Sequence, residues 1–294
     1  MIEKKRSVHS TVPTTVKVAV VQMCSVPESA RNFATAEKLI AEAAVQGARW
    51  IALPENFNSM ARRDDRYRLA DSIDDSEART FLAARAKRHR IYLSAGVFVQ
   101  SKKIDRLFNR CLVFSPDGEE VAMYQKNHLF DVDLDANDQH SESSYCIAGD
   151  RPVTVDCDWG CVGLSICYDL RFPEYYRLLA DAGATMILAP SAFTCPTGEA
   201  HWEILIRSRA IENQVFLLAP AQWGTHENGR LTYGDSMIVD PWGKILVRRR
   251  QGTGVILASL DFDKLRAIRK KLPALEHRRY PVNVQPADKT EIPN

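Results

Sequence analysis

The feature that most constrains the fold of this chain is a regular alternation of apolar runs with segments of helical spacing. The run VKVAVVQM is apolar and β-branched, and segment 28–48 after it repeats apolar residues at helical spacing until Gly47. A strand at 50–55, a helix at 75–90 and a strand at 91–100 continue this order. Because strands that alternate with helices form sheets covered by helices, the pattern predicts an α/β fold.

The second half of the chain repeats the alternation. The spacing predicts strands at 161–166, 185–192 and 214–221, with helices at about 173–182 and 199–213 between them. No linker rich in glycine, serine or proline divides the two halves. We therefore expect one domain in which two sheets pack against each other.

Two hairpins are expected beside these elements. Segment 109–126 contains two strands around a Pro-Asp-Gly turn, which is a strong hairpin signal. The segment DSMIVDPWGKILVRR turns at Pro-Trp-Gly and is followed by the strand TGVILASLD and a short basic helix. The intervening stretch 127–151 is polar and is expected to be a loop.

Charge and apolar content exclude several classes of protein. The 39 Lys and Arg against 37 Asp and Glu leave a formal charge of +2, which gives no reason to expect a nucleic acid or an anionic membrane as partner. The sequence contains no run of about 18 apolar residues, so a transmembrane helix is not expected. Residues 1–15 lack the apolar core of a secretory signal and are expected to form a flexible tail. Seven scattered cysteines favour reduced thiols and hence a cytoplasmic protein.

Cys167 is the first candidate for chemistry. It closes an apolar strand and precedes a helix that begins near Pro173. A strand end that leads to a helix start exposes a side chain and offers backbone N–H groups nearby, which suits a nucleophile. A buried structural thiol fits the same stretch equally well. The segment GLSIC also resembles a G-x-S-x-G elbow with Ser165 as nucleophile, but cysteine stands where the elbow has glycine.

A catalytic cysteine needs a base or a positive neighbour that favours the thiolate. His128 and His201 are candidates for a Cys-His pair. Glu55 and Lys126 each end an expected strand, and either alone is also typical of a strand end in solvent. Because Glu55, Lys126 and Cys167 all stand at carboxyl ends of strands, they are expected to converge at one edge, where open α/β sheets bind ligands.

A zinc site is the weakest of the candidate sites. Cys157 and Cys161 are spaced C-x3-C, with Cys146 and His140 nearby. This spacing does not match the usual zinc knuckles. We therefore expect no metal.

These motifs resemble those of a known family. Glu55 in ALPENF, Lys126 in YQKNHLFD and Cys167 in GLSICYDLRFPE are similar to the Glu-Lys-Cys triad of the nitrilase, or carbon-nitrogen hydrolase, superfamily. The resemblance covers residues 16–280 and implies an additional active-site glutamate, Glu142. It also implies an α-β-β-α sandwich that pairs across a helix-lined interface into a homodimer, in which the closing segment AIRKKLPALEHRRY packs on the partner. Residues 281–294 are expected to be a C-terminal tail.

The resemblance further implies a reaction. Glu55 acts as general base, Cys167 attacks an amide carbon, and the oxyanion rests against Lys126 and the backbone N–H of Tyr168. Ammonia leaves, and water activated by Glu55 releases the acid from the thioester. Glu142 is expected to orient Lys126 and to tune the pair of carboxylates. No cofactor is implied, and the expected partners are a small-molecule amide and water.

The branch of the superfamily that the chain resembles limits the expected substrates. The chain resembles the Nit branch, and the A-x-A-Q-x-G pattern at 219–224 favours enzymes that hydrolyse deaminated glutathione. The segment HLFDVDL suits ω-amidases of α-ketoglutaramate and α-ketosuccinamate equally well, and loop 133–146 departs from the pattern of both groups. A nitrilase, a carbamoylase or acyl-transfer relative, and a non-catalytic binding or scaffold protein remain as alternatives.

Four residues are candidates for contact with the substrate. Arg171, four residues after the nucleophile, is the candidate ligand of a substrate carboxylate because a guanidinium binds carboxylates through two hydrogen bonds. A surface salt bridge would explain this arginine equally well. Tyr168, Phe193 and Thr194 stand near the same strand ends and are expected to line the cleft.

Overall fold

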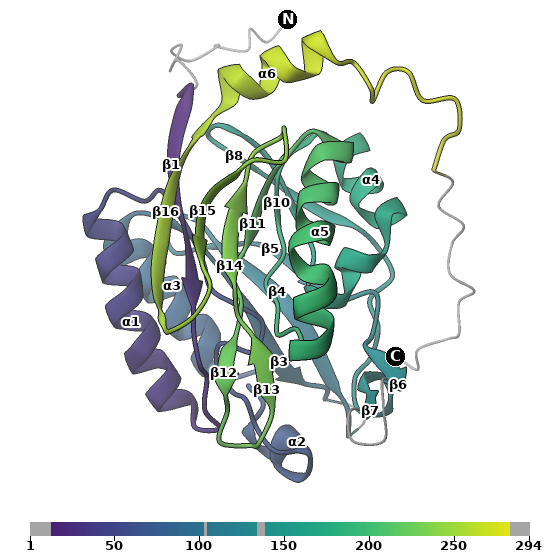
Figure 1. Ribbon diagram of the computed structural model, residues 1–294. Coiled ribbons are helices and arrows are strands. Elements are labelled where there is room, and N and C mark those ends of the chain that lie inside the picture. The colour runs from purple at the N-terminus through teal and green to yellow at the C-terminus, as the bar shows by residue number, and fades with distance from the viewer. Residues whose placement is uncertain (1–12, 103–104, 134–138, 283–294) are drawn as a thin grey trace, which may run out of the picture.

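Two six-stranded sheets pack face to face, and helices cover both outer faces (Figure 1). The computed structural model describes residues 13–102, 105–133 and 139–282. The α/β fold and the two packed sheets are therefore confirmed. Most of the two expected tails, 1–15 and 281–294, lies outside the described residues, although Thr15 already belongs to the first strand.

The first sheet has the order β16-β1-β2-β3-β4-β5. These strands are β16 (Gly254–Asp261), β1 (Thr15–Gln22), β2 (Trp50–Ala52), β3 (Tyr92–Gln100), β4 (Leu107–Phe114) and β5 (Glu120–Gln125). The strands β1, β2 and β3 are parallel, and β16, β4 and β5 continue the sheet by antiparallel pairing. Helices α1 (Ser29–Val45) and α3 (Glu77–His89) cover its outer face with buried side chains that include Ile40 and Leu82.

The second sheet has the order β15-β14-β11-β10-β9-β8. These strands are β15 (Ile245–Arg249), β14 (Ser236–Val239), β11 (Phe216–Ala219), β10 (Ala184–Leu188), β9 (Gly160–Leu164) and β8 (Val153–Cys157). The three central strands β9, β10 and β11 are parallel. Helices α4 (Pro173–Asp181) and α5 (Cys195–Asn213) cover the outer face of this sheet (Figure 1).

The core between the sheets explains why they pack. Alternate residues of β1, such as Val18 and Val20, point to the other sheet and share one cluster with Leu164 and Leu188. Burying one such side chain stabilises the fold by about 1.5–3 kcal/mol. Trp50 is fully buried in the same cluster. The two halves of the chain are therefore held together by a continuous apolar layer.

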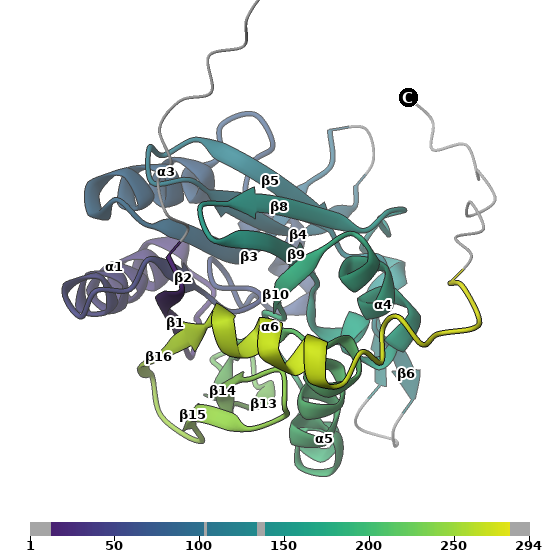
Figure 2. The same cartoon turned by 90° about the horizontal axis from the view of Figure 1, so that it is seen from above.

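The last helix closes one end of the sandwich. Helix α6 (Phe262–Lys271) lies across the ends of the strands when the molecule is seen from above (Figure 2). Phe262 packs on Phe216 at a centroid distance of 5.5 Å, and Arg269 donates to the carbonyl of Ala184 at 2.9 Å. Since Ala184 and Phe216 begin β10 and β11, α6 covers the amino ends of the parallel strands. The carboxyl ends lie at the opposite edge.

Several short elements surround that opposite edge. They are η1 (Arg63–Asp65), α2 (Arg66–Leu69), β6 (Asp131–Asp133), β7 (Gln139–Ser141), η2 (Glu142–Ser144), η3 (Cys167–Arg171), β12 (Trp223–Thr225) and β13 (Leu231–Tyr233). The expectation of a plain loop at 127–151 was wrong, because β6 and β7 pair there as a small antiparallel ribbon that leads into η2. Strand β10 ends at Leu188 rather than at 192, because Pro190 follows and lacks a backbone N–H group.

Candidate active site

The segment after β2 carries Glu55 along the end of the first sheet. The amide of Gly96 donates to the carbonyl of Pro54 at 3.2 Å, and Phe57 donates back to Gly96 at 3.1 Å. A Cβ at position 96 would lie 2.6 Å from the Cα of Glu55, so only glycine fits this close approach. The side chain of Gln222 donates to the carbonyl of Glu55 at 3.0 Å. These contacts fix the backbone of Glu55.

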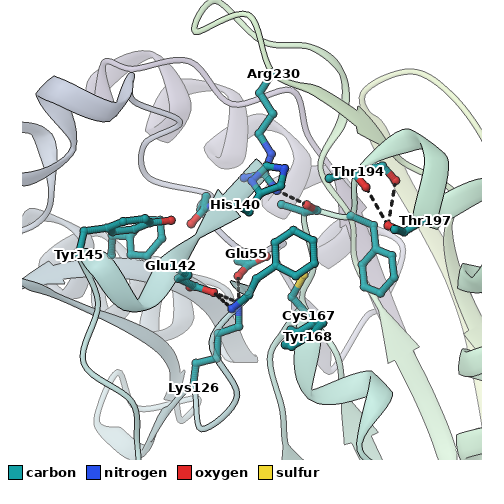
Figure 3. Close-up of a pocket in the computed structure, with 15 residues that line it drawn as sticks. Glu55, Lys126, His140, Glu142, Tyr145, Cys167, Tyr168, Thr194, Thr197 and Arg230 are labelled. Carbon is teal, nitrogen blue, oxygen red and sulfur yellow. Dashed lines mark hydrogen bonds and ion pairs between the residues drawn. The ribbon is translucent and has the colours of Figure 1, made fainter. Parts of the chain in front are cut away.

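Lys126 follows β5 directly and joins two carboxylates. Its Nζ donates to Oε1 of Glu55 at 3.1 Å and to Oε2 of Glu142 at 2.8 Å (Figure 3). All three residues are at most 4% exposed. Because the interior offers little water to solvate them, each of these charges is stabilised mainly by the opposite charge beside it.

Asn109 ties the two carboxylates together from β4. Its Nδ2 donates to Oε1 of Glu55 at 2.8 Å and to Oε1 of Glu142 at 3.0 Å. Glu142 begins η2, and its Oε2 also accepts from the backbone N–H of Phe130 at 2.7 Å. The carboxyl groups are thus held by several donors and have little freedom to rotate.

Cys167 stands in a strained turn after β9. Its φ of 49° is unusual for a residue other than glycine, and such backbone strain costs about 1–3 kcal/mol. The turn is held by Asp169, which is fully buried. The carboxylate of Asp169 accepts from the backbone N–H of Ile166 at 2.8 Å and from the hydroxyl of Tyr124 at 2.7 Å. The neighbouring network therefore fixes the conformation that presents the thiol.

The electrostatics of the site leave the proton on sulfur. Burial raises the pKa of Cys167, and the carboxylate of Glu55 raises it further. Burial would also raise the pKa of Glu55, but Lys126 and Asn109 together hold it below its ordinary value. The two carboxylates overcome the effect of burial on Lys126 and raise its pKa. At neutral pH the site therefore holds a thiol, a carboxylate and an ammonium.

These groups open into one cavity with about 470 Å³ of empty space, its mouth included. Figure 3 shows the labelled side chains converging on it. Seven of the eight candidate residues line it: Glu55, Lys126, Glu142, Cys167, Tyr168, Phe193 and Thr194. A thiol beside a base and a cation, in a hollow with aromatic walls, can attack a carbonyl carbon and stabilise the resulting oxyanion.

The eighth candidate, Arg171, is not among the lining residues. Its guanidinium lies 5.8 Å from the ring centres of Tyr168 and Phe193, both of which line the cavity. Its nitrogens also lie 3.4 Å from Nδ1 of His201. Arg171 therefore stands behind the aromatic wall of the cavity.

The alternative nucleophile and bases lie elsewhere. Ser165 is fully buried, and its hydroxyl donates to the carbonyl of Leu188 at 2.7 Å. His128 binds Asp169 through Nδ1 at 2.7 Å and stacks on Phe172. Neither these two residues nor His201 line the cavity. The geometry thus gives no support to a serine elbow or a Cys-His pair.

Sequence reasoning missed Asn109, Asp169, Gln222 and Arg230. Asn109 interrupts the apolar run of β4, and a buried amide in a strand is a signal because it requires partners. Arg230 lines the cavity from the β12–β13 hairpin, where the sequence ENGR is typical of an ordinary turn. No local pattern distinguishes that arginine from a solvated one.

Within residues 13–102, 105–133 and 139–282, no group of three His, Cys, Asp or Glu side chains is arranged to hold a metal ion. In that same part of the chain, every helix is too short or too polar to cross a membrane.

Comparisons with known proteins agree with this chemistry. A family model described as carbon-nitrogen hydrolase matches residues 17–270. The chain is 39% identical to a deaminated glutathione amidase of Synechocystis over 264 residues, which is 88% of this chain and 97% of that protein. It is 35% identical to the human omega-amidase NIT2 over 266 residues, 90% of this chain and 96% of that protein.

Solved structures show the same fold. The Caenorhabditis elegans NitFhit protein superposes with a TM-score of 0.86 at 34% identity, covering 94% of this chain and 68% of that one. Saccharomyces cerevisiae Nit3, described as a member of branch 10 of the nitrilase superfamily, has a TM-score of 0.83 at 32% identity and covers 93% and 100%. The expected α-β-β-α sandwich is therefore confirmed.

Proposed function

Because the chain belongs to the carbon-nitrogen hydrolase family, whose members cleave carbon-nitrogen bonds other than peptide bonds, we propose that it is a thiol-dependent amidase with Cys167 as nucleophile. The observation that carries this proposal is the meeting of the thiol with Glu55 and Lys126 in one buried cavity. A structural cysteine would need neither a buried carboxylate nor a buried ammonium beside it.

The first half of the reaction forms a thioester. Glu55 takes the proton of the thiol while the sulfur of Cys167 attacks the amide carbon. The carbonyl oxygen becomes an oxyanion, which Lys126 and the backbone N–H of Tyr168 stabilise. As the carbon-nitrogen bond breaks, Glu55 returns its proton to the leaving nitrogen, and ammonia or an amine departs.

The second half reverses these proton movements with water in place of the thiol. Glu55 removes a proton from water, and the resulting hydroxide attacks the thioester carbon. The carbon-sulfur bond then breaks, and the proton on Glu55 passes to the sulfur. Glu142 keeps Lys126 oriented toward the oxyanion throughout and acts as a positioning residue. No cofactor or metal enters these steps.

The proposed substrate is the amide of a small carboxylic acid, of the deaminated glutathione type. Relatives of this name from Synechocystis and human are 39% and 38% identical over 88% and 89% of this chain, which supports the choice. An ω-amidase is the second candidate, because the human omega-amidase NIT2 is 35% identical over a similar length. Arg171 stays our candidate for a carboxylate on the acyl half of the substrate.

We extend the proposal to a homodimer in the cytoplasm. Ile204 and Ile211 lie one heptad apart on α5 and are 66% and 48% exposed, and Trp242 nearby is 62% exposed. Large apolar side chains gathered on one helix face are typical of an interface between subunits. All seven cysteines are free thiols, as expected in a reducing compartment. Light scattering of the wild type and of Ile204→Glu tests the dimer.

A substrate panel tests the proposed function. Deaminated glutathione, α-ketoglutaramate and a simple nitrile are incubated with the wild type and with Cys167→Ala, and the released amine or ammonia is measured. Turnover of an amide that disappears in Cys167→Ala supports the amidase and its nucleophile. Turnover of the nitrile alone would point to a nitrilase, and no turnover with equal alkylation of several cysteines would point to a binding protein.

A further inference from the structure

A second hollow adjoins the catalytic cavity. It holds about 360 Å³ of empty space, its mouth included, and shares Asn56, Phe98, Tyr145 and Arg230 with that cavity. We call it the arginine pocket, because Arg66 and Arg230 both line it. None of its lining residues is acidic; the others are Ser59, Met60, Ala61, Ala70 and Asn228. The two hollows therefore lie side by side, share part of their walls and differ in the chemistry of the rest.

Arg230 stands at the junction of the two hollows. One guanidinium nitrogen, Nη2, donates to the carbonyl of Ala192 at 2.6 Å, whereas the buried Nε has no hydrogen-bond partner. Ala192 is also the residue whose backbone interacts with the thiol of Cys167. The guanidinium therefore lies close to the reacting sulfur and retains a buried donor that no protein group uses.

Arg66 supplies the second positive charge. Its guanidinium lies 4.4 Å from the ring centre of Tyr145, which separates the arginine pocket from the catalytic cavity. In the part of the chain that the structure describes, neither arginine is within ion-pair distance of a carboxylate, in contrast to arginines such as Arg209 and Arg248. Two cations beside a hollow without acidic lining residues favour an anionic occupant.

The arginine pocket lies on the side where the leaving group departs. In the proposed reaction Glu55 returns a proton to the leaving nitrogen, so that nitrogen must lie next to Glu55. The following residue, Asn56, lines both hollows, and its buried Oδ1 has no partner. The charge of Arg230 also acts on Glu55 and contributes to its lowered pKa. A leaving amine larger than ammonia would extend past Asn56 into the arginine pocket.

We propose that Arg230 and Arg66 bind a carboxylate carried by the amine half of the substrate. The inference rests on the proposed function and narrows it, because it requires a secondary amide whose nitrogen belongs to a peptide-like amine. Deaminated glutathione has this form, since glutathione is a tripeptide whose glycine keeps a free carboxylate. A primary amide that releases ammonia leaves the arginine pocket unused.

The experiment compares deaminated glutathione with its derivative in which the glycine carboxylate is a carboxamide. The ratio of kcat/KM for the acid over the carboxamide is measured in the wild type, Arg230→Gln, Arg66→Gln and Arg68→Gln. Arg68 lies on the same short helix as Arg66, is well exposed and lines neither hollow, which makes it the matched control. We expect the ratio to fall about tenfold or more in the first two variants, as the loss of a charge-assisted hydrogen bond implies, and to stay constant in Arg68→Gln.

A binding measurement separates this inference from the proposed function. Calorimetric titration of Cys167→Ala with the same two probes reports affinity without turnover. If Cys167→Ala binds the acid more tightly than the carboxamide, and adding Arg230→Gln abolishes this preference, the result supports the arginine pocket. That conclusion holds even if the wild type hydrolyses neither probe and the amidase proposal fails. Turnover with the same acid-to-carboxamide ratio in the wild type, Arg230→Gln and Arg66→Gln would overturn the inference and leave the amidase standing.

Discussion

Glu142 accepts a hydrogen bond of 2.8 Å from the ammonium of Lys126, and both side chains are almost completely buried. This contact divides the positive charge of Lys126 between two carboxylates, because Glu55 accepts from the same nitrogen at 3.1 Å. The basicity of Glu55 therefore depends on a residue that does not touch the sulfur.

Glu142→Gln is expected to lower kcat about tenfold to a hundredfold with a small change in KM, because Lys126 then stabilises the charge of Glu55 alone and makes it a weaker base. Steady-state kinetics and a thermal melt of the same preparation measure this. Glu119→Gln, at an exposed position, is the control. Undiminished turnover in Glu142→Gln would remove Glu142 from the mechanism.

Lys126→Met is expected to abolish turnover and to lower the free energy of unfolding by about 3–5 kcal/mol near pH 7, because two buried carboxylates lose their counter-charge. In the wild type the pKa of Glu55 lies below its ordinary value, so its contribution to stability is present above pH 4.5 and is lost as the pH falls through the folded pKa.

In Lys126→Met the shift of the Glu55 pKa reverses its direction. Burial then raises the pKa of Glu55 above 4.5, and protonation relieves the unpaired charge. The difference in the free energy of unfolding between Lys126→Met and the wild type should therefore become smaller as the pH falls from 7 toward 4.5. Urea unfolding at several pH values measures it, with the exposed Lys38→Met as control. A difference that stays constant with pH would contradict the pairing.

The pH dependence of turnover distinguishes Glu55 from a histidine base. Since Lys126 and Asn109 hold the pKa of Glu55 low despite burial, kcat/KM should stay level from pH 7 down to about 5.5 and decline only at lower pH. A Cys-His pair would give an acid limb near the ordinary histidine pKa of about 6.5. An acid limb at that value that disappears in His128→Gln would refute the assignment of Glu55.

Gly96→Ala is expected to lower kcat about a hundredfold and to destabilise the fold by about 1–3 kcal/mol. The added Cβ would meet backbone atoms of Glu55 at 2.6 and 3.2 Å, so the base must move away from the thiol. Kinetics and urea unfolding are measured together. Full activity would mean that the segment of Glu55 yields without displacing the carboxylate.

Arg171→Ala tests the acyl half of the substrate. If the guanidinium behind Tyr168 and Phe193 binds a substrate carboxylate, KM for acids such as α-ketoglutaramate should rise about tenfold, and KM for a neutral amide should change less. Arg68→Ala is the control. An unchanged KM for the acid would assign Arg171 to packing on the aromatic wall alone.

Much of the fold and of the site could be predicted from the sequence, because the residues involved occur at the ends of regular elements. Glu55, Lys126 and Cys167 follow β2, β5 and β9, and the carboxyl ends of these strands meet at one edge. Gly47, which follows α1, marked the end of that helix correctly. The spacing of apolar residues along the sequence indicates these ends of strands and helices directly.

The rest depends on contacts between distant segments. Asn109 and Glu142 are 33 residues apart and meet only when η2 folds back on β4. Arg230 reaches the cavity from a hairpin, and the turn residues of that hairpin do not indicate which part of the molecule it packs against. The same holds for Arg171, whose distance from Cys167 along the chain gave no indication that aromatic rings stand between them. Neither periodicity nor turn chemistry contains this information.

The pairing of β1 with β16 has a consequence for synthesis on the ribosome. The first strand of the chain pairs along its whole length with the last one, from Thr15 opposite Asp261 to Gln22 opposite Gly254. Until β16 emerges, β1 is an apolar edge strand with no partner on that side. The proposed nucleophile, Cys167, is therefore synthesised before the sheet that Glu55 and Lys126 extend from is complete, and the open edge of β1 is exposed to wrong pairing in that interval.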